Sequence, residues 1–275
     1  MSATFHFTVD CDWIPNTERN LPRIFELIEK FGIEPTFFIT GKFAEDYGDY
    51  VLEMKRRNWE IGSHGLKHGL DPEENFSERV SYDKQWRLLS DSTGMIEKVT
   101  GMMPVIFRAP RLKISDHTFK ILTELKYKID SSIPVRRFDF GFGSISNTKH
   151  LNKGNSSFYI NDSLLEIPPS ALFFPMNMRL VRLIGAMATA NLISLIKRSS
   201  DVVVFYVHPL EFLKSSDLNY VPIDCKQYLK SCGPQNFGLL EEFLGKVMDG
   251  GMKTSRMMDH LDRNVGRKMR FEDQC

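Results

Sequence analysis

Hydrophobic and polar positions alternate along the first half of the chain in short blocks of two kinds. Residues 4–10 and 35–40 are apolar runs rich in aromatic and β-branched residues, which is typical of buried strands. Residues 21–31 and 44–57 have apolar side chains at helical spacing, and residues 59–63 return to a strand pattern. Strands that alternate with helices of this length predict βαβ units and a parallel sheet.

The alternation continues in the second half of the chain. We expect two further helices, at 77–98 and 115–126. We also expect three further strands, at 105–108, 127–130 and 201–209. Residues 136–163 are rich in Gly, Asn and Ser, which predicts an extended loop or a small hairpin. Residues 213–237 look irregular, and residues 239–248 read as a closing helix.

The most apolar helix candidate covers residues 179–197. A transmembrane span needs about 20 apolar residues, and Asn191 and Ser194 interrupt this one. We therefore expect a packed helix and no transmembrane segment. Basic residues at both ends of the segment leave a peripheral contact with a membrane surface open as a second interpretation.

The composition is that of an ordinary globular protein. The chain has 275 residues, of which 42% are hydrophobic and 26% are charged. Its 36 Lys and Arg residues nearly balance its 35 Asp and Glu residues, so no overall field favours a nucleic-acid partner. Composition does not predict an oligomeric state.

The N-terminus and the cysteines bear on the compartment. The start, M-S-A-T-F-H-F, lacks a basic region followed by a long apolar stretch, so no secretory signal is predicted. The four cysteines have neither C-x-x-C spacing nor the density of a disulfide framework. We expect a cytoplasmic protein with reduced thiols; a mature form whose signal has been removed is the competing interpretation.

Two acids stand at the end of the first strand. In T-F-H-F-T-V-D-C-D-W, residues 4–13, the alternating apolar positions account for a strand, but nothing in a strand requires Asp10 and Asp12 at its exit. Downstream, S-H-G-L-K-H-G supplies His64 and His68 directly after the third strand. If these residues form one helical turn, both imidazoles point the same way and can bind one metal ion.

A third ligand would strengthen that interpretation, because a lone histidine pair is often only solvated. The carboxyl ends of parallel strands lie at one face of an α/β fold, so Asp12 is expected beside His64 and His68. Two histidines and one carboxylate with open positions are typical of a catalytic zinc site. Asp10, two residues earlier on the same face, is close enough to accept a proton from a water without being a ligand.

Three more strand ends carry polar residues, namely Arg108, Asp130 and His208. Taken singly, each has an ordinary explanation: a surface ion pair, a helix cap and a histidine bonded to the backbone. Together with the acids and the histidine pair, they place chemistry-bearing side chains at five strand ends. Coincidence is a poor explanation for that set.

The ordered motifs resemble those of the polysaccharide deacetylases of the NodB-homology group, carbohydrate esterase family four. The likeness covers roughly residues 4–212, and 252–261 is similar to the family's closing strand and turn. The motifs are T-V-D-C-D-W, P-T-F-F-I-T-G, E-I-G-S-H-G-L-K-H, F-R-A-P-R, Y-K-I-D-S-S, L-L-E-I-P-P-S and F-Y-V-H-P-L-E. We accordingly interpret 1–275 as a single deacetylase domain with a variable C-terminal part, 213–275.

The resemblance implies a distorted (β/α) barrel, usually with seven strands, and hydrolysis of an N-acetyl or related N-acyl group. It implies a divalent metal held by Asp12, His64 and His68, with Zn²⁺ expected ahead of Co²⁺, Mn²⁺, Ni²⁺ or Fe²⁺. The partner expected from this family is an N-acylated carbohydrate.

The resemblance also implies catalytic roles. Asp10 would be the general base, and Arg108 would orient it through an ion pair. His208 would be the general acid that protonates the leaving amine, and Asp130 would hold His208 protonated and correctly turned. The D-C-D spacing, where D-D is commoner in the family, leaves the division of labour between Asp10 and Asp12 less secure.

Three residues beside these motifs, Trp13, Arg111 and Pro209, are expected to contact the substrate. Arg111 stands where many family members have a small or aromatic residue, and it adds positive charge at the mouth of the site. A sugar that bears a phosphate or a lipid pyrophosphate is therefore worth considering over neutral chitin.

The leading hypothesis is a metal-dependent deacetylase acting on an N-acetylated sugar in surface-glycan or related carbohydrate metabolism. A second hypothesis is another C–N hydrolase on the same fold, a sugar deformylase or an allantoinase-like amidohydrolase. A third is a non-catalytic carbohydrate-binding protein, whose expected signature is loss of the base, a ligand or the acid. All of those residues are present here.

Overall fold

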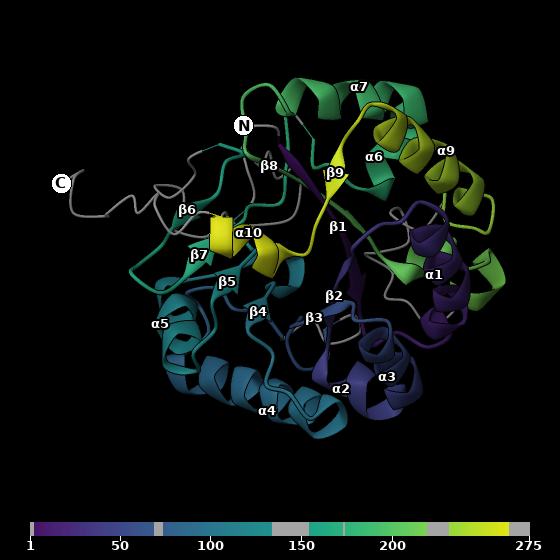
Figure 1. Cartoon of the computed structure of the whole chain (residues 1–275). Helices are drawn as coiled ribbons and strands as arrows, with labels where there is room; N and C mark the ends of the chain where they lie inside the picture. The colour runs from purple at the N-terminus through teal and green to yellow at the C-terminus, as the bar shows by residue number, and fades with distance from the viewer. Residues whose placement is uncertain (1–2, 69–73, 134–153, 173, 219–230, 264–275) are drawn as a thin grey trace.

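A computed structural model describes residues 3–68, 74–133, 154–172, 174–218 and 231–263 (Figure 1). Its strands form one sheet, and their bounds are β1 Thr4–Cys11, β2 Thr36–Ile39, β3 Glu60–Ser63, β4 Ile106–Phe107, β5 Ile129–Asp130, β6 Phe158–Tyr159, β7 Leu165–Glu166, β8 Val202–Val207 and β9 Lys253–Thr254. The strand order is β6-β7-β5-β4-β3-β2-β1-β8, and β9 pairs with the start of β1.

The sheet curls into a distorted (β/α) barrel. Seven strands, from β7 through β1 to β8, run parallel, and β6 is antiparallel to β7. The segment after β7 reaches β8 at the other end of this order: the Ser170 N–H donates to the Val204 carbonyl at 3.3 Å, and the Val204 N–H donates to Ser170 Oγ at 2.9 Å. The expected fold class is confirmed, while the single-domain interpretation stays a prediction.

Helices lie around the outside of the sheet, except α10, which packs through Met257 with Phe38 and Val204 of the sheet and lies over its middle (Figure 1). They are α1 Leu21–Lys30, α2 Gly41–Asp46, α3 Gly48–Arg56, α4 Tyr82–Thr100, α5 Asp116–Glu124, α6 Met178–Ile184, α7 Ala186–Ile196, α9 Asn236–Asp249 and α10 Met257–Arg263. Short 3-10 turns are η1 Thr17–Asn20, η2 Pro110–Leu112, η4 Pro209–Phe212 and η5 Ser215–Leu218. The segment predicted as the family's closing strand and turn is the strand β9 followed by the helix α10.

Two predicted helices are each divided in the structure. Residues 44–57 were expected to form one helix, but Tyr47 has non-helical backbone angles and separates α2 from α3. The apolar segment 179–197 is divided at Gly185, whose φ of 86° and ψ of 163° end α6 and begin α7. No helix in the described part of the chain is long and apolar enough to cross a membrane.

The two faces of strand β1 carry different kinds of side chain, apolar on the outer face and polar on the inner face. Phe5, Phe7 and Val9 belong to the large hydrophobic cluster between the sheet and the outer helices. Because side chains alternate along a strand, Thr8 and Asp10 face the opposite side, the barrel interior. The first acid of the D-x-D motif therefore lies on the inner face of a strand that is buried along its whole length.

Candidate functional site

The polar residues predicted at the strand ends gather at the carboxyl end of the barrel. Asp10 is near the end of β1, His64 directly follows β3, Arg108 directly follows β4, and His208 directly follows β8. Parallel pairing of these strands, in the register Cys11 with Ile39 and Ile39 with Ser63, brings their ends to one level. The geometry at this end is built from residues that are far apart in sequence.

Asp12, His64 and His68 form a compact cluster. Each His Nε2 lies 3.5 Å from Asp12 Oδ1, and all three side chains are buried. One ligand-type atom from each residue lies within 4.8 Å of the others. In the described part of the chain this is the group whose spacing suits a metal ion.

The local structure around the histidines differs from the prediction. Residues 64–68 are not a helical turn; they form a bend in which Gly65 and His68 have positive φ angles of 81° and 45°. Glu74, buried and not foreseen from the sequence, holds this bend. Its Oε2 accepts the N–H groups of Lys67 and His68, each at 2.6 Å, and its Oε1 accepts that of Leu66.

The chemistry of the cluster fits a divalent cation. His64 Nδ1 lies 2.8 Å from the Arg108 carbonyl, and a proton on Nδ1 donated there leaves the Nε2 lone pair toward Asp12. Burial, with His64 and Arg111 nearby, holds the pKa of His68 well below 6.5, so this imidazole is neutral as a ligand must be. Asp12 Oδ1 is buried with no hydrogen-bond partner among the described residues.

Asp10 is held by Arg108 beside this cluster. Arg108 Nη1 donates to Asp10 Oδ1 and to Thr8 Oγ1, each at 2.7 Å, and the guanidinium lies 4.2 Å from the centre of the Phe38 ring. Burial raises the pKa of Asp10, but the charges of Arg108 and the neighbouring His64 and His208 outweigh it and leave the pKa below 3.8. Asp10 is therefore an ionised carboxylate in a fixed position.

His208 is half-buried at the start of η4, facing Asp10. Its Nε2 lies 3.8 Å from Asp10 Oδ2, and its Nδ1 lies 3.6 Å from Glu211 Oε2. Burial alone would lower the pKa of His208, but the adjacent Glu211 carboxylate, with the charges of Asp10 and Asp12, raises it to about 9. The imidazole is therefore protonated at neutral pH.

Asp130, predicted to hold His208, has other neighbours in the structure. Asp130 is buried on β5 and accepts a hydrogen bond from Ser132 Oγ at 2.5 Å; its register partner on β7 is Glu166. Burial raises the pKa of Asp130 to about 6 and that of Glu166 well above 4.5. The carboxylate beside His208 is instead Glu211, three residues along the chain in the quoted H-P-L-E motif.

The three residues predicted to contact a substrate lie in different surroundings. Trp13 is half-buried, and its indole N–H donates to Asp46 Oδ2 at 2.7 Å. Arg111 is half-buried with a φ of 58°, and it acts electrostatically on both Asp12 and His68. Pro209 is buried at the start of η4, and its carbonyl accepts a hydrogen bond from Asn20, a position that favours a role in shaping the turn.

Known proteins share this sequence pattern and fold. Residues 3–129 match the model of the family described as polysaccharide deacetylase. The peptidoglycan-N-acetylmuramic acid deacetylase PdaC of Bacillus subtilis (strain 168) is 27% identical over 94 residues, which are 34% of this chain and 19% of that protein. A peptidoglycan deacetylase of Helicobacter pylori is 27% identical over 116 residues, 42% of this chain and 38% of that protein.

Similarity in structure extends over nearly the whole chain. A candidate polysaccharide deacetylase from Mycobacterium smegmatis superposes with a TM-score of 0.63 at 17% identity, covering 96% of this chain and 91% of that one. At this identity the likeness is one of fold. The chain spans well under two thirds of the two curated relatives that it matches.

Proposed function

We propose that this chain, which belongs to the polysaccharide deacetylase family, is a metal-dependent hydrolase that removes an N-acetyl group from a sugar. The observation that carries the proposal is the meeting of three kinds of group at one end of the barrel. These are a ligand cluster suited to a metal, an ionised carboxylate fixed by an arginine, and a protonated histidine. Metal-assisted hydrolysis of an amide uses all three functions.

Asp12, His64 and His68 would hold the ion, and two histidines with one carboxylate favour Zn²⁺. When bound, such an ion polarises the acyl carbonyl and lowers the pKa of a water molecule. The residues that hold the ion are positioned by backbone and side-chain contacts outside the cluster, through the Arg108 carbonyl and the Glu74 carboxylate.

Asp10 and His208 divide the proton transfers. Asp10 is ionised and held by Arg108, and it takes a proton from the attacking water. The water oxygen forms a bond to the acyl carbon at the same time. The C–N bond then breaks, and His208 donates the proton on Nε2 to the leaving nitrogen, giving acetate and an amine. The 3.8 Å between His208 Nε2 and Asp10 Oδ2 supports roles for both side chains in one reaction.

A sugar that carries phosphate is the substrate class we propose. Arg111 acts electrostatically on Asp12 and His68, which supports a positive charge near the ligand cluster. Guanidinium groups bind phosphate through paired hydrogen bonds. The curated relatives act on peptidoglycan according to their names, and the loops that would select among substrates fall partly outside the described residues.

The test of the proposed function is release of the acyl group. Purified protein is assayed for acetate and formate release from N-acetylated and N-formylated sugars, with and without phosphate. Acetate release that stops on treatment with a chelator and returns with Zn²⁺ is the expected result. Binding of the sugars without release of either acid would contradict the proposal and favour a carbohydrate-binding protein.

Metal binding is expected to depend on Glu74 although it is not a ligand. Glu74→Gln keeps the size of the side chain but removes the charge that accepts the N–H groups next to His68. Loss of such support typically lowers metal affinity about 10- to 100-fold. Competition with a zinc-chelating dye measures the affinity, and Glu78→Gln, at an exposed acid nearby, is the control. Equal affinities in the two variants would remove Glu74 from this role.

A further inference from the structure

The turn after β8 contains a buried carboxylate, Glu211, to which the proposed reaction gives no role. Its side chain is fully buried, whereas that of His208 is 17% exposed. Glu211 Oε2 accepts the backbone N–H of His208 at 2.9 Å and lies 3.6 Å from His208 Nδ1. The carboxylate thus faces the ring nitrogen on the side away from Asp10.

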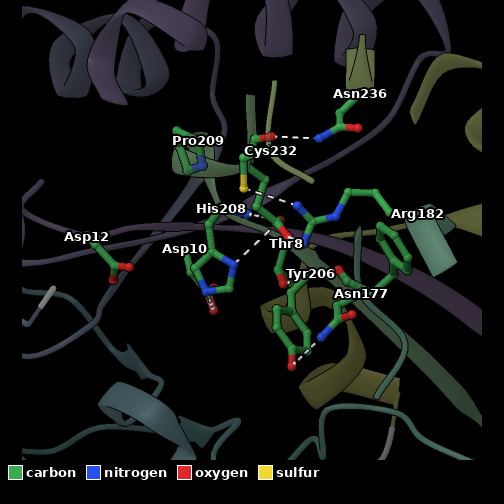
Figure 2. Close-up of polar contacts among 12 residues, drawn as sticks. Thr8, Asp10, Asp12, Asn177, Arg182, Tyr206, His208, Pro209, Cys232 and Asn236 are labelled. Atoms are coloured by element: carbon green, nitrogen blue, oxygen red, sulfur yellow. Dashed lines mark hydrogen bonds and ion pairs between the residues drawn. The ribbon is translucent and has the colours of Figure 1, made fainter. Parts of the chain in front are cut away.

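A second buried charge reaches Glu211 from helix α6. The Arg182 side chain is 4% exposed, and its Nη2 lies 3.4 Å from Glu211 Oε1. Its Nη1 donates to Cys232 Sγ at 3.1 Å, as Figure 2 shows. Burial raises the pKa of Cys232 to about 11, so the thiol is neutral and its sulfur acts as an acceptor.

The backbone of Glu211 is fixed as well. Its carbonyl accepts the N–H of Gly233 at 3.1 Å and the side-chain amide of Asn236, at the start of α9, at 2.8 Å. Burial raises the pKa of Glu211, but His208 and Arg182 outweigh it, and the group stays ionised. Glu211 is therefore fixed at its backbone and at its carboxylate, and such a residue is suited to orient the imidazole ring that it faces.

We propose that Glu211 and Arg182 are a positioning pair for His208. Glu211 turns the imidazole so that Nδ1 faces the carboxylate and Nε2 faces Asp10, and Arg182 fixes Glu211. A carboxylate on one ring nitrogen sets which nitrogen meets the reacting atoms and stabilises the imidazolium. This inference rests on the proposed role of His208 as general acid.

A structural alternative uses the same contacts. His208 and Glu211 also form a capping box at the start of η4, so Glu211 could serve only to hold the turn. Glu211→Gln separates the two roles, because the amide oxygen still accepts the His208 N–H while the negative charge is lost. It also leaves Arg182 without its carboxylate, which costs stability in a buried site. The double variant Glu211→Gln/Arg182→Met removes both charges and avoids that cost.

The experiment compares wild type, Glu211→Gln, the double variant, Arg182→Met and Arg182→Lys. Arg179→Met, on the exposed side of the same helix, is the control. Each is measured for melting temperature, metal content and kcat against pH on an N-acetyl sugar. We expect the two Glu211 variants to lose about 10²-fold in kcat with metal retained, as when a positioned acid is disabled. Arg182→Met is expected to lose less, Arg182→Lys to recover part, and Arg179→Met to match wild type.

The alkaline limb of the profile gives the second readout. The groups that face His208 are Asp10, Asp12 and Glu211, and Arg182 faces Glu211 from α6. Loss of the Glu211 charge should therefore move the alkaline limb to lower pH. A wild-type limb and wild-type kcat in a folded Glu211→Gln would overturn the proposal, as would equal effects of Arg182→Met and Arg179→Met.

An NMR titration keeps this test separate from the test of function. The His208 imidazole signal, assigned by its absence in His208→Ala, is followed with pH in protein without added metal. A lower pKa of His208 in Glu211→Gln supports the pair even if wild type releases no acetate, in which case the proposed function fails alone. An unchanged His208 pKa overturns the pair whatever the activity.

Discussion

Asp10→Asn is expected to lower turnover by about 10²- to 10⁴-fold with the metal retained, whereas Asp12→Asn is expected to lose both. The two acids are two residues apart but have different neighbours. Asp12 Oδ1 lies 3.5 Å from Nε2 of both His64 and His68. Asp10 Oδ1 instead accepts from Arg108, and its Oδ2 faces His208.

The measurement pairs kcat on an N-acetyl sugar with metal content after dialysis. Asp10→Asn leaves Arg108 buried without its carboxylate, so a thermal melt must show that the variant is folded; removing one partner of a buried pair typically costs about 3–5 kcal/mol. Thr8 Oγ1 and the Ser131 carbonyl still accept from Arg108, which supports a folded variant. Metal loss in Asp10→Asn as complete as in Asp12→Asn would mean that both acids are ligands.

The sequence was enough to predict that the site lies at the carboxyl ends of the parallel strands, because the hydrophobic pattern shows where each strand ends. Hydrophobic alternation in β1 ended at the D-x-D motif, and apolar runs ended at His64, Arg108 and His208. Parallel strands deliver such ends to one face of the fold whatever their order. That rule sufficed to place Asp12 beside the two histidines.

The partners around the barrel could not be predicted, because strand patterns do not give strand order. Asp130 lies on β5, which pairs with β4 and β7, and its register partner is Glu166. The capping-box spacing from His208 to Glu211 was the available signal for the true neighbour. Glu74 gave no signal, because a loop acid that accepts backbone N–H groups looks like any solvated acid.

His208→Ala is expected to keep its fold and its metal yet lose most activity on an N-acetyl sugar. An amine leaves a tetrahedral intermediate slowly unless it is protonated, and a positioned acid typically contributes about 10²- to 10⁴-fold. The fold is expected to persist because Glu211 remains paired with Arg182 and Asp10 remains paired with Arg108, so no buried charge is left alone. A histidine with only a structural role would instead cost stability and little activity.

An activated ester with a phenolate leaving group isolates the acid role, because that group departs without a proton. We expect His208→Ala to keep far more of its wild-type rate on the ester than on the amide. The pH dependence should also distinguish the two substrates, because His208 can act as an acid only while it is protonated. Wild-type turnover of the amide should fall as pH rises through about 9, the pKa of His208. Turnover of the ester should not fall in this range. Equal fractional losses on the two substrates would show that His208 does not protonate the leaving group.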